Sequence, residues 1–145
     1  MRLFFLASTA LLAATIVACG QESSPSTAKA SNAAASNRSP LEVVNARMTA
    51  YNAHDLDAFL EVYADEVTIF TYPDRSLGGG VDHLRSIFEP MFKQGEVQVT
   101  LEHQIAKDSY VVNHETVVEG DSTTEYVSIY EVQDGLIQSV RFVRD

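Results

Sequence analysis

Apolar residues recur at intervals of three or four in three stretches of the chain, which is the spacing of one face of an α-helix. The first stretch predicts a helix over residues 40–52, opened by the capping motif Ser-Pro-Leu-Glu at 39–42. The second predicts a short helix over 56–63, and the third a helix over 81–93 that Pro90 kinks or shortens. The apolar positions that define these helices are Leu41, Val44, Met48, Tyr51, Leu56, Phe59, Leu60, Tyr63, Val81, Leu84, Ile87, Phe88 and Met91.

Elsewhere in the chain after residue 66, apolar and polar residues alternate, which predicts β-strands. A first strand covers 67–72 and is broken by "PDRSLGGG" at 73–80. The remaining predicted strands are 97–105, 110–119, 123–132 and 136–143, and Gly-Asp and Asp-Gly turns suited to hairpins separate the last three. Helices followed by a run of strands predict an α+β domain with the helices packed on one face of a curved antiparallel sheet.

Six carboxylates lie in residues 55–74, from the start of the second helix to just beyond the first strand. Asp55 stands where a carboxylate caps the second helix, while Asp57 and Glu61 lie off its apolar stripe. Asp65 and Glu66 fall in the predicted turn that follows. We therefore expect this acidic run to be a solvated face with helix caps, and no catalytic acid within it.

The N-terminal segment has a different pattern. Arg2, an apolar run over 3–17 and the small residue Ala18 predict a secretory signal peptide over 1–18, too short to span a membrane. The segment "IVAC" at 16–19 resembles the bacterial lipobox, which implies that Cys19 is lipidated; an ordinary secretory signal is the alternative. We expect an exported protein held on the membrane by lipid at Cys19, on the periplasmic side of the outer membrane in a Gram-negative host.

Composition limits the partners and cofactors. Residues 19–39 are rich in Ser, Ala and Asn and predict a flexible tether, which leaves 40–145 as a single domain. The net charge of −10 repels phosphate backbones, so we expect no nucleic-acid partner. Cys19 is the only cysteine, which excludes a disulfide within the chain, and the four histidines lack metal-binding spacing. We expect neither a metal nor another cofactor.

Three segments carry a family resemblance: "YNAHDLDAFLEVYADEVTIF" at 51–70, "GVDHLRSIF" at 80–88 and "SIYEVQDGLIQSVRFV" at 128–143. They resemble the nuclear transport factor 2-like superfamily and, within it, the SnoaL-like or steroid isomerase-like branch. The resemblance extends over 41–144 and implies a cone-shaped curved sheet whose concave face three helices cover, around an apolar cavity. Relatives include enzymes, binding proteins and assembly modules, and they commonly dimerise through their sheets, so a homodimer is consistent with the resemblance.

The enzymes of this superfamily provide a test of activity. Ketosteroid isomerases carry a tyrosine, a general base and a protonated aspartate at positions that correspond here to Arg47, Thr71 (or Tyr72 with a one-residue slip) and Ser128. Thr71 cannot act as a base at neutral pH, and Ser128 is a weaker donor than a neutral carboxylic acid. The isomerase residues are therefore unmatched, and we assign no catalytic residue.

Several side chains are candidates to line the expected cavity. Alternation along strand 97–105 places His103 on the apolar side with Leu101 and Ile105. On strand 110–119 either the His114 face or the Glu115 face lies inward, and the pattern leaves both open. An inward Glu115 would pair with Arg47 or His103. The candidate ligand-binding residues are Arg47, Tyr51, Tyr72, His103, Glu115, Tyr126, Ser128 and Phe142.

The leading interpretation is a lipid-anchored envelope protein whose domain binds a small, largely apolar ligand. The second is an enzyme of isomerase, cyclase or hydrolase type that uses His103 or Glu115 as acid or base. The third is a non-catalytic dimerisation or interaction module. The position of these two side chains relative to the cavity distinguishes the first two interpretations.

Overall fold

The computed structural model describes residues 37–144, so the predicted signal peptide, Cys19 and most of the tether lie outside the described residues. Three helices and six strands are present in the described part of the chain. In chain order they are α2 (Pro40–Ala53), α3 (Leu56–Leu60), β1 (Tyr63–Thr71), β2 (Arg75–Gly79), α4 (Val81–Gln94), β3 (Val97–Lys107), β4 (Tyr110–Glu119), β5 (Ser122–Gln133) and β6 (Leu136–Val143).

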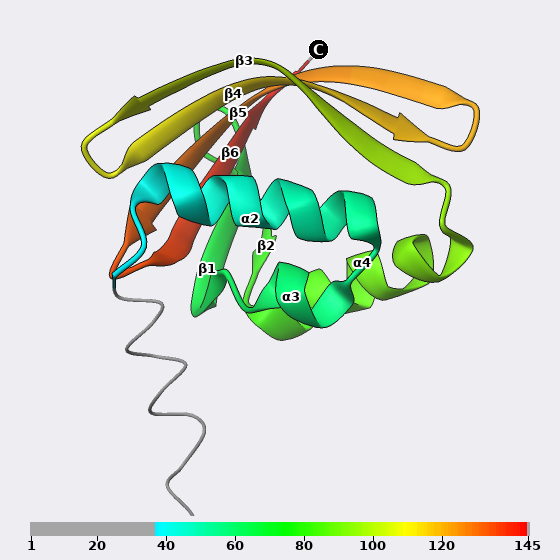
Figure 1. Cartoon of the computed structure of the whole chain (residues 1–145), viewed down its shortest axis with the longest axis horizontal. Helices are drawn as coiled ribbons and strands as arrows, with labels where there is room; N and C mark the ends of the chain where they lie inside the picture. The colour runs from blue at the N-terminus through cyan, green and yellow to red at the C-terminus, as the bar shows by residue number, and fades with distance from the viewer. Residues whose placement is uncertain (1–36, 145) are drawn as a thin grey trace, which may run out of the picture.

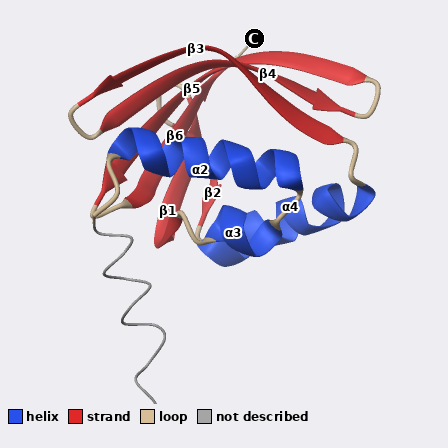
Figure 2. Cartoon of the chain, viewed as in Figure 1, coloured by secondary structure: helices blue, strands red, loops and turns tan. Residues whose placement is uncertain are grey.

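The strands form one sheet in the order β2-β1-β6-β5-β4-β3. All neighbours are antiparallel except β1 and β6, which run parallel. The sheet arches over the helices, which lie on its concave side (Figures 1 and 2). The predicted fold class is confirmed, with one correction: the sheet is mixed and not purely antiparallel.

Strand β2 was not predicted, because its sequence reads as a turn. It forms because glycines let it approach β1 closely: a Cβ at Gly79 would lie 2.5 Å from the backbone carbonyl oxygen of Val67. β2 is short and exposed along its whole length, as suits the edge of a sheet.

Two other boundaries differ from the prediction. Tyr63 begins β1 and does not end a helix, and Asp65 and Glu66 lie in that strand and not in a turn. Pairing of β1 with β6 overrides the helical spacing of the local sequence. Helix α4 continues through Pro90 to Gln94, where Gly95 in a left-handed conformation ends it, so Pro90 does not shorten it.

Local signals at the helix starts are confirmed. Ser39 and Glu42 form the predicted capping box, with the Ser39 backbone N–H donating to Glu42 Oε2 over 2.7 Å. Asp55 Oδ1 accepts from the Ala58 backbone N–H over 3.0 Å. The six carboxylates between residues 55 and 74 are all exposed, and the only salt bridge among them joins Asp57 to Arg85 over 3.1 Å. The acidic run is a solvated face, as predicted.

The core lies between the concave face of the sheet and the helices. Helix α2 buries one long face against strands β3 to β6. An aromatic cluster joins α2 to α3 and α4: Tyr51, Phe59, Phe88 and Phe92 have ring centroids 4.6–6.1 Å apart. Tyr51 and Phe88 of this cluster also line the cavity described below.

Candidate ligand cavity

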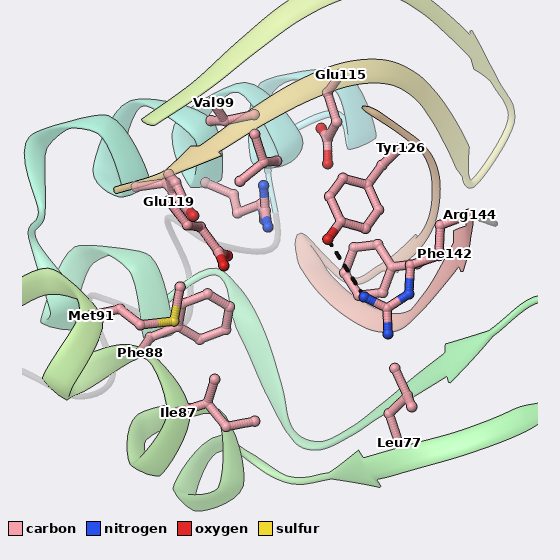
Figure 3. Close-up of a pocket in the computed structure, with 13 residues that line it drawn as sticks. Leu77, Ile87, Phe88, Met91, Val99, Glu115, Glu119, Tyr126, Phe142 and Arg144 are labelled. Atoms are coloured by element: carbon pink, nitrogen blue, oxygen red, sulfur yellow. Dashed lines mark hydrogen bonds between the residues drawn. The ribbon is translucent and has the colours of Figure 1, made fainter. Parts of the chain in front are cut away.

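Two adjoining cavities of about 170 and 160 Å³ lie between the helices and the concave face of the sheet. Apolar side chains make up most of their walls. Figure 3 shows the first cavity, with Ile87, Phe88 and Met91 of α4 on one side and Tyr126 and Phe142 of the sheet on another. Residues that line both cavities are Arg47, Leu77, Ile87, Phe88 and Phe142.

Arg47 projects from the buried face of α2 and is only 5% exposed. Its Nε donates to Tyr63 Oη over 2.9 Å. Its Cζ lies 5.3–5.5 Å from the ring centroids of Tyr51, Phe59 and Tyr130, within the range of cation–π attraction. Burial lowers the pKa of Arg47, but the nearby Tyr130, Tyr63 and Glu115 outweigh that effect and raise it above its ordinary value. The guanidinium is therefore charged.

The sequence left open whether the His114 face or the Glu115 face of β4 lies inward. The Glu115 face does, and Glu115 is 2% exposed. Its carboxylate accepts from Ser128 Oγ over 2.6 Å, from Tyr130 Oη over 3.2 Å and from Asn113 Nδ2 over 3.2 Å. No direct salt bridge joins it to Arg47 within the described residues. The expected pairing with Arg47 is therefore a through-space attraction.

His103 is misplaced by the sequence prediction. Between Leu101 and His103 the register of β3 against β4 shifts, because β3 carries the extra residue Glu102. This β-bulge reverses the side of the sheet on which the following residues project. Gln104 consequently points inward and donates to Asn113 Oδ1 over 2.9 Å, while His103 lies on the opposite, exposed face.

On that outer face His103 meets His114. Their Nδ1 atoms are 3.4 Å apart and their rings are stacked at 6° with centroids 5.7 Å apart. His114 Nε2 also pairs with Glu125 Oε1. His103 is therefore neither a cavity residue nor a partner of Glu115.

The other candidate ligand-binding residues fall into two groups, those that line the first cavity and those that do not. Tyr51, Tyr126 and Phe142 line the first cavity, as do Arg47 and Glu115. Ser128 stands behind Glu115 as its hydrogen-bond donor. Tyr72 is 56% exposed and lines neither cavity, so its inward placement was wrong: the chain leaves β1 at Thr71, and Tyr72 enters the turn to β2.

Two charged cavity residues were missed. Glu119 and Arg144 line the first cavity and are exposed, so they mark its open side. Arg144 Nη1 lies 3.5 Å from Tyr126 Oη (Figure 3). Glu119 could have been found from Glu115, since residues four apart on a strand share a face. Arg144 follows the last strand, where alternation gives no signal.

Within residues 37–144, no group of three or more His, Cys, Asp or Glu side chains is arranged to hold a metal ion. No helix in that range has the length and apolar composition needed to cross a bilayer.

The described residues have the nuclear transport factor 2-like fold, which a solved NTF2-like structure shares. A family model described as a SnoaL-like domain matches residues 44–140, and the chain belongs to that family. A comparison with curated proteins gives no match.

Solved structures share the fold at low identity. An NTF2-like protein of unknown function from Cytophaga hutchinsonii is 16% identical, with a TM-score of 0.64, covering 74% of this chain and 90% of that one. An LEH-like epoxide hydrolase of Mycobacterium tuberculosis is 20% identical, with a TM-score of 0.62, covering 73% and 82%. A computationally designed 17-OHP binder is 24% identical, with a TM-score of 0.65, covering 74% and 92%. These likenesses establish the fold and no activity.

Proposed function

We propose that this protein is a lipid-anchored component of the bacterial envelope whose SnoaL-like domain binds a small, largely apolar molecule inside its cone. The observation that carries the proposal is the pair of adjoining cavities, which are walled mainly by apolar side chains and keep an open side. Concave apolar sites with a few polar groups are the usual sites of small ligands. The designed 17-OHP binder supports the proposal, because it is a binding protein with the same fold.

The size of the cavities limits the ligand. An engineered protein cavity of about 150 Å³ binds benzene, so each of the two cavities offers space for about one ring. Because the cavities share five lining residues, one ligand can extend through both. We therefore expect a compound of one or two rings, or an aliphatic chain of similar volume.

An enzyme that uses Glu115 is the second candidate function, favoured by the position of this carboxylate in the cavity wall and by the similarity in fold to an epoxide hydrolase. Three donors already hold the Glu115 oxygens, which favours a structural role for this carboxylate. We therefore rank binding above catalysis.

The proposal is tested by closing the cavity. Leu77 lines both cavities, so Leu77→Trp should fill part of the space and weaken binding of the neutral two-ring probe 2-ethylnaphthalene by about tenfold or more, measured by calorimetry. Val127→Trp is the matched control, because Val127 has the same 36% exposure but lies on the outer face.

The chain has no natural tryptophan, so each variant carries a single fluorescent reporter. If the probe quenches the emission of the Leu77→Trp variant and leaves that of Val127→Trp unchanged, the ligand lies in the cone. Equal binding by wild type and Leu77→Trp, or probe binding that only Val127→Trp weakens, would refute the proposal.

A further inference from the structure

The outer face of the sheet carries a pair of histidines that the β-bulge in β3 brings together. His103 lies directly opposite His114 in the pairing of β3 with β4. Because Leu101 pairs with Glu115, a regular ladder would place Glu102 opposite His114, so the bulge replaces a carboxylate by a histidine there. The two histidines are eleven residues apart in the sequence. Strand pairing and not sequence spacing joins them, which is why the spacing of histidines predicted no metal site.

The imidazole rings of His103 and His114 meet end to end. Their Nδ1 atoms are 3.4 Å apart, and their planes are parallel to within 6°. The ring centroids are 5.7 Å apart, which is about the separation of the two nitrogens plus the distance from each nitrogen to its own centroid. The parallel rings are therefore displaced so far sideways that they lie nearly in one plane, and each Nδ1 points at the other.

Hydrogen bonding defines where the protons of the neutral pair lie. A carboxylate only accepts, so His114 Nε2 carries the proton that it donates to Glu125 Oε1. The Nδ1 atom of neutral His114 is then an acceptor, and His103 Nδ1–H donates to it. A shift of that proton to His103 Nε2 leaves two lone pairs that face each other. Glu125 orients the His114 ring, as carboxylates do behind metal-binding histidines.

Two nitrogens that face each other along one line suit an ion with linear, two-fold coordination. Metal–imidazole bonds of about 2 Å placed end to end span about 4 Å, so the rings need to separate by about half an ångström from 3.4 Å. A tetrahedral ion such as Zn²⁺ needs bonds that converge at an angle and further ligands. Within residues 37–144 no third His, Cys, Asp or Glu is arranged to supply one. Linear coordination by two imidazoles is typical of the monovalent d¹⁰ ions Cu⁺ and Ag⁺.

The surroundings of the pair favour a monovalent ion over a divalent one. Three apolar side chains line the same depression as the two histidines: Ile105, Val112 and Val127. An apolar shell limits access of water and disfavours the higher charge, and thereby the oxidised form of a copper ion. Two carboxylates lie on the same face, since Glu125 accepts from His114 and Glu102 accepts from Thr116. They supply negative charge close to a bound cation.

We propose that His103 and His114 form a two-coordinate site for one Cu⁺ ion, held between their Nδ1 atoms on the outer face of the sheet. Glu125 is a positioning residue that holds the His114 ring. Both ligands belong to one chain, so one ion binds per chain. The site lies on the opposite face of the sheet from the ligand cavity, so it is independent of the proposed function.

Titration with Ag⁺, a redox-stable probe, tests the site directly. The protein is the mature chain carrying Cys19→Ala, because Cys19 is the only thiol and thiolates bind these ions. In ¹⁵N-labelled protein, one equivalent of Ag⁺ in chloride-free buffer should split the Nδ1 resonances of His103 and His114 by coupling to silver. The resonances of His54 and His83 should stay unchanged. One equivalent of Cu⁺, added without oxygen, should give the X-ray absorption spectrum of a two-coordinate ion with nitrogen ligands.

Variants attribute the binding to the pair. Loss of an outer partner of a metal ligand costs about 10- to 100-fold in affinity, so His103→Gln and His114→Gln should each lower the Cu⁺ affinity about a hundredfold or more. Competition with a chromophoric Cu⁺ chelator measures this. Glu125→Gln should weaken binding about tenfold and keep the silver coupling to both rings. His83→Gln is the matched control, because it removes a histidine outside the pair, and should bind as the parent chain does.

Three results would overturn the proposal. Tighter binding of Zn²⁺ than of Cu⁺, or a copper ion with three or more ligands, would exclude the linear site. Equal Cu⁺ affinity in the parent chain and in His103→Gln or His114→Gln would exclude this pair, as would silver coupling to His54 or His83 in its place. The proposed ligand function stands in each case, because 2-ethylnaphthalene should bind in the cone equally with and without Cu⁺.

Discussion

At the scale of single residues, the unusual feature is a charged arginine in the core of a small domain. Arg47 is tolerated because three aromatic rings surround it, Tyr63 accepts from its Nε, and Glu115 supplies a nearby negative charge. Each cation–π contact in a desolvated setting contributes roughly 2 kcal/mol or more. Burying a guanidinium whose terminal nitrogens have no hydrogen-bond partner in the described residues is energetically unfavourable. This cost supports a role for Arg47 in ligand recognition.

Buried phenols beside Arg47 predict a stability that falls at alkaline pH. Burial raises the pKa of Tyr51, Tyr63 and Tyr130, although Arg47 opposes this in each case. The unfolded chain loses these protons near pH 10, whereas the folded protein holds them longer. The folded state thus binds more protons, and its stability decreases as pH rises above about 10.

The Tyr51 contribution can be isolated. With a folded pKa of about 12, Tyr51 should account for a loss of about 2 kcal/mol in the free energy of unfolding between pH 9 and pH 12. Tyr51→Phe should remove that part of the slope in urea titrations carried out at a series of pH values. An identical pH slope in wild type and Tyr51→Phe would contradict this assignment.

At the scale of elements, the β-bulge in β3 decides what each side of the sheet presents. On the concave side it delivers Gln104 to Asn113, next to Glu115. On the outer side it gathers His103, Ile105, Val112, His114 and Val127 around a shallow apolar depression. The helices leave this side of β3 to β5 uncovered (Figure 2). Ile105 there, near the end of the edge strand β3, is 69% exposed, a high value for a large apolar side chain.

This outer surface predicts self-association through the sheet. We expect the mature chain to form a homodimer, and Ile105→Lys to make it monomeric, because an unpaired charge would enter an apolar interface. Leu41→Lys is the control, since Leu41 is an exposed apolar residue of α2, away from that surface. Light scattering coupled to size-exclusion chromatography gives the mass. A monomeric wild type at micromolar concentration would rule the dimer out.

At the scale of the whole molecule, the expected lipid anchor would bring the ligand cavity close to a source of apolar compounds. A lipid at Cys19 followed by the tether over 19–39 would hold the domain close to a bilayer, where apolar compounds concentrate. The anchor, the tether up to residue 36 and the export signal lie outside the described residues, so this arrangement is a proposal drawn from the sequence.

Fractionation tests the anchor. Full-length protein should enter the membrane fraction, and Cys19→Ala should leave it, because the acyl chains supply the binding energy. Ser24→Ala, a change within the tether, should fractionate as wild type does. Mass spectrometry of the N-terminal peptide should show the added acyl chains on Cys19. Retention of Cys19→Ala in the membrane fraction would be the outcome that excludes lipid anchoring at this position.

Local patterns were sufficient to predict most of the fold. The capping box at Ser39, the cap at Asp55 and the alternation of β4 to β6 are properties of neighbouring residues, and the structure confirms them. The same holds for the solvated acidic run. The helical spacing that placed Met48 and Tyr51 on the apolar face of α2 is confirmed too, since both residues are buried.

What the sequence could not determine depends on pairing between distant segments. The spacing of apolar residues predicts that Tyr63 is helical, but its pairing with the parallel strand β6 makes it part of β1. β2 exists only because Gly79 can approach β1. His103 alternates with apolar residues, yet the bulge opposite β4 turns it outward.

By itself, the sequence of this protein determined the three helices and the last three strands, since short-range spacing specifies them, but it misplaced His103 and Tyr72 among the candidate cavity residues. The inward face of β4, the partners of Glu115 and the open terminal nitrogens of Arg47 were decided only by the tertiary structure, because these features depend on which distant side chains share a buried space.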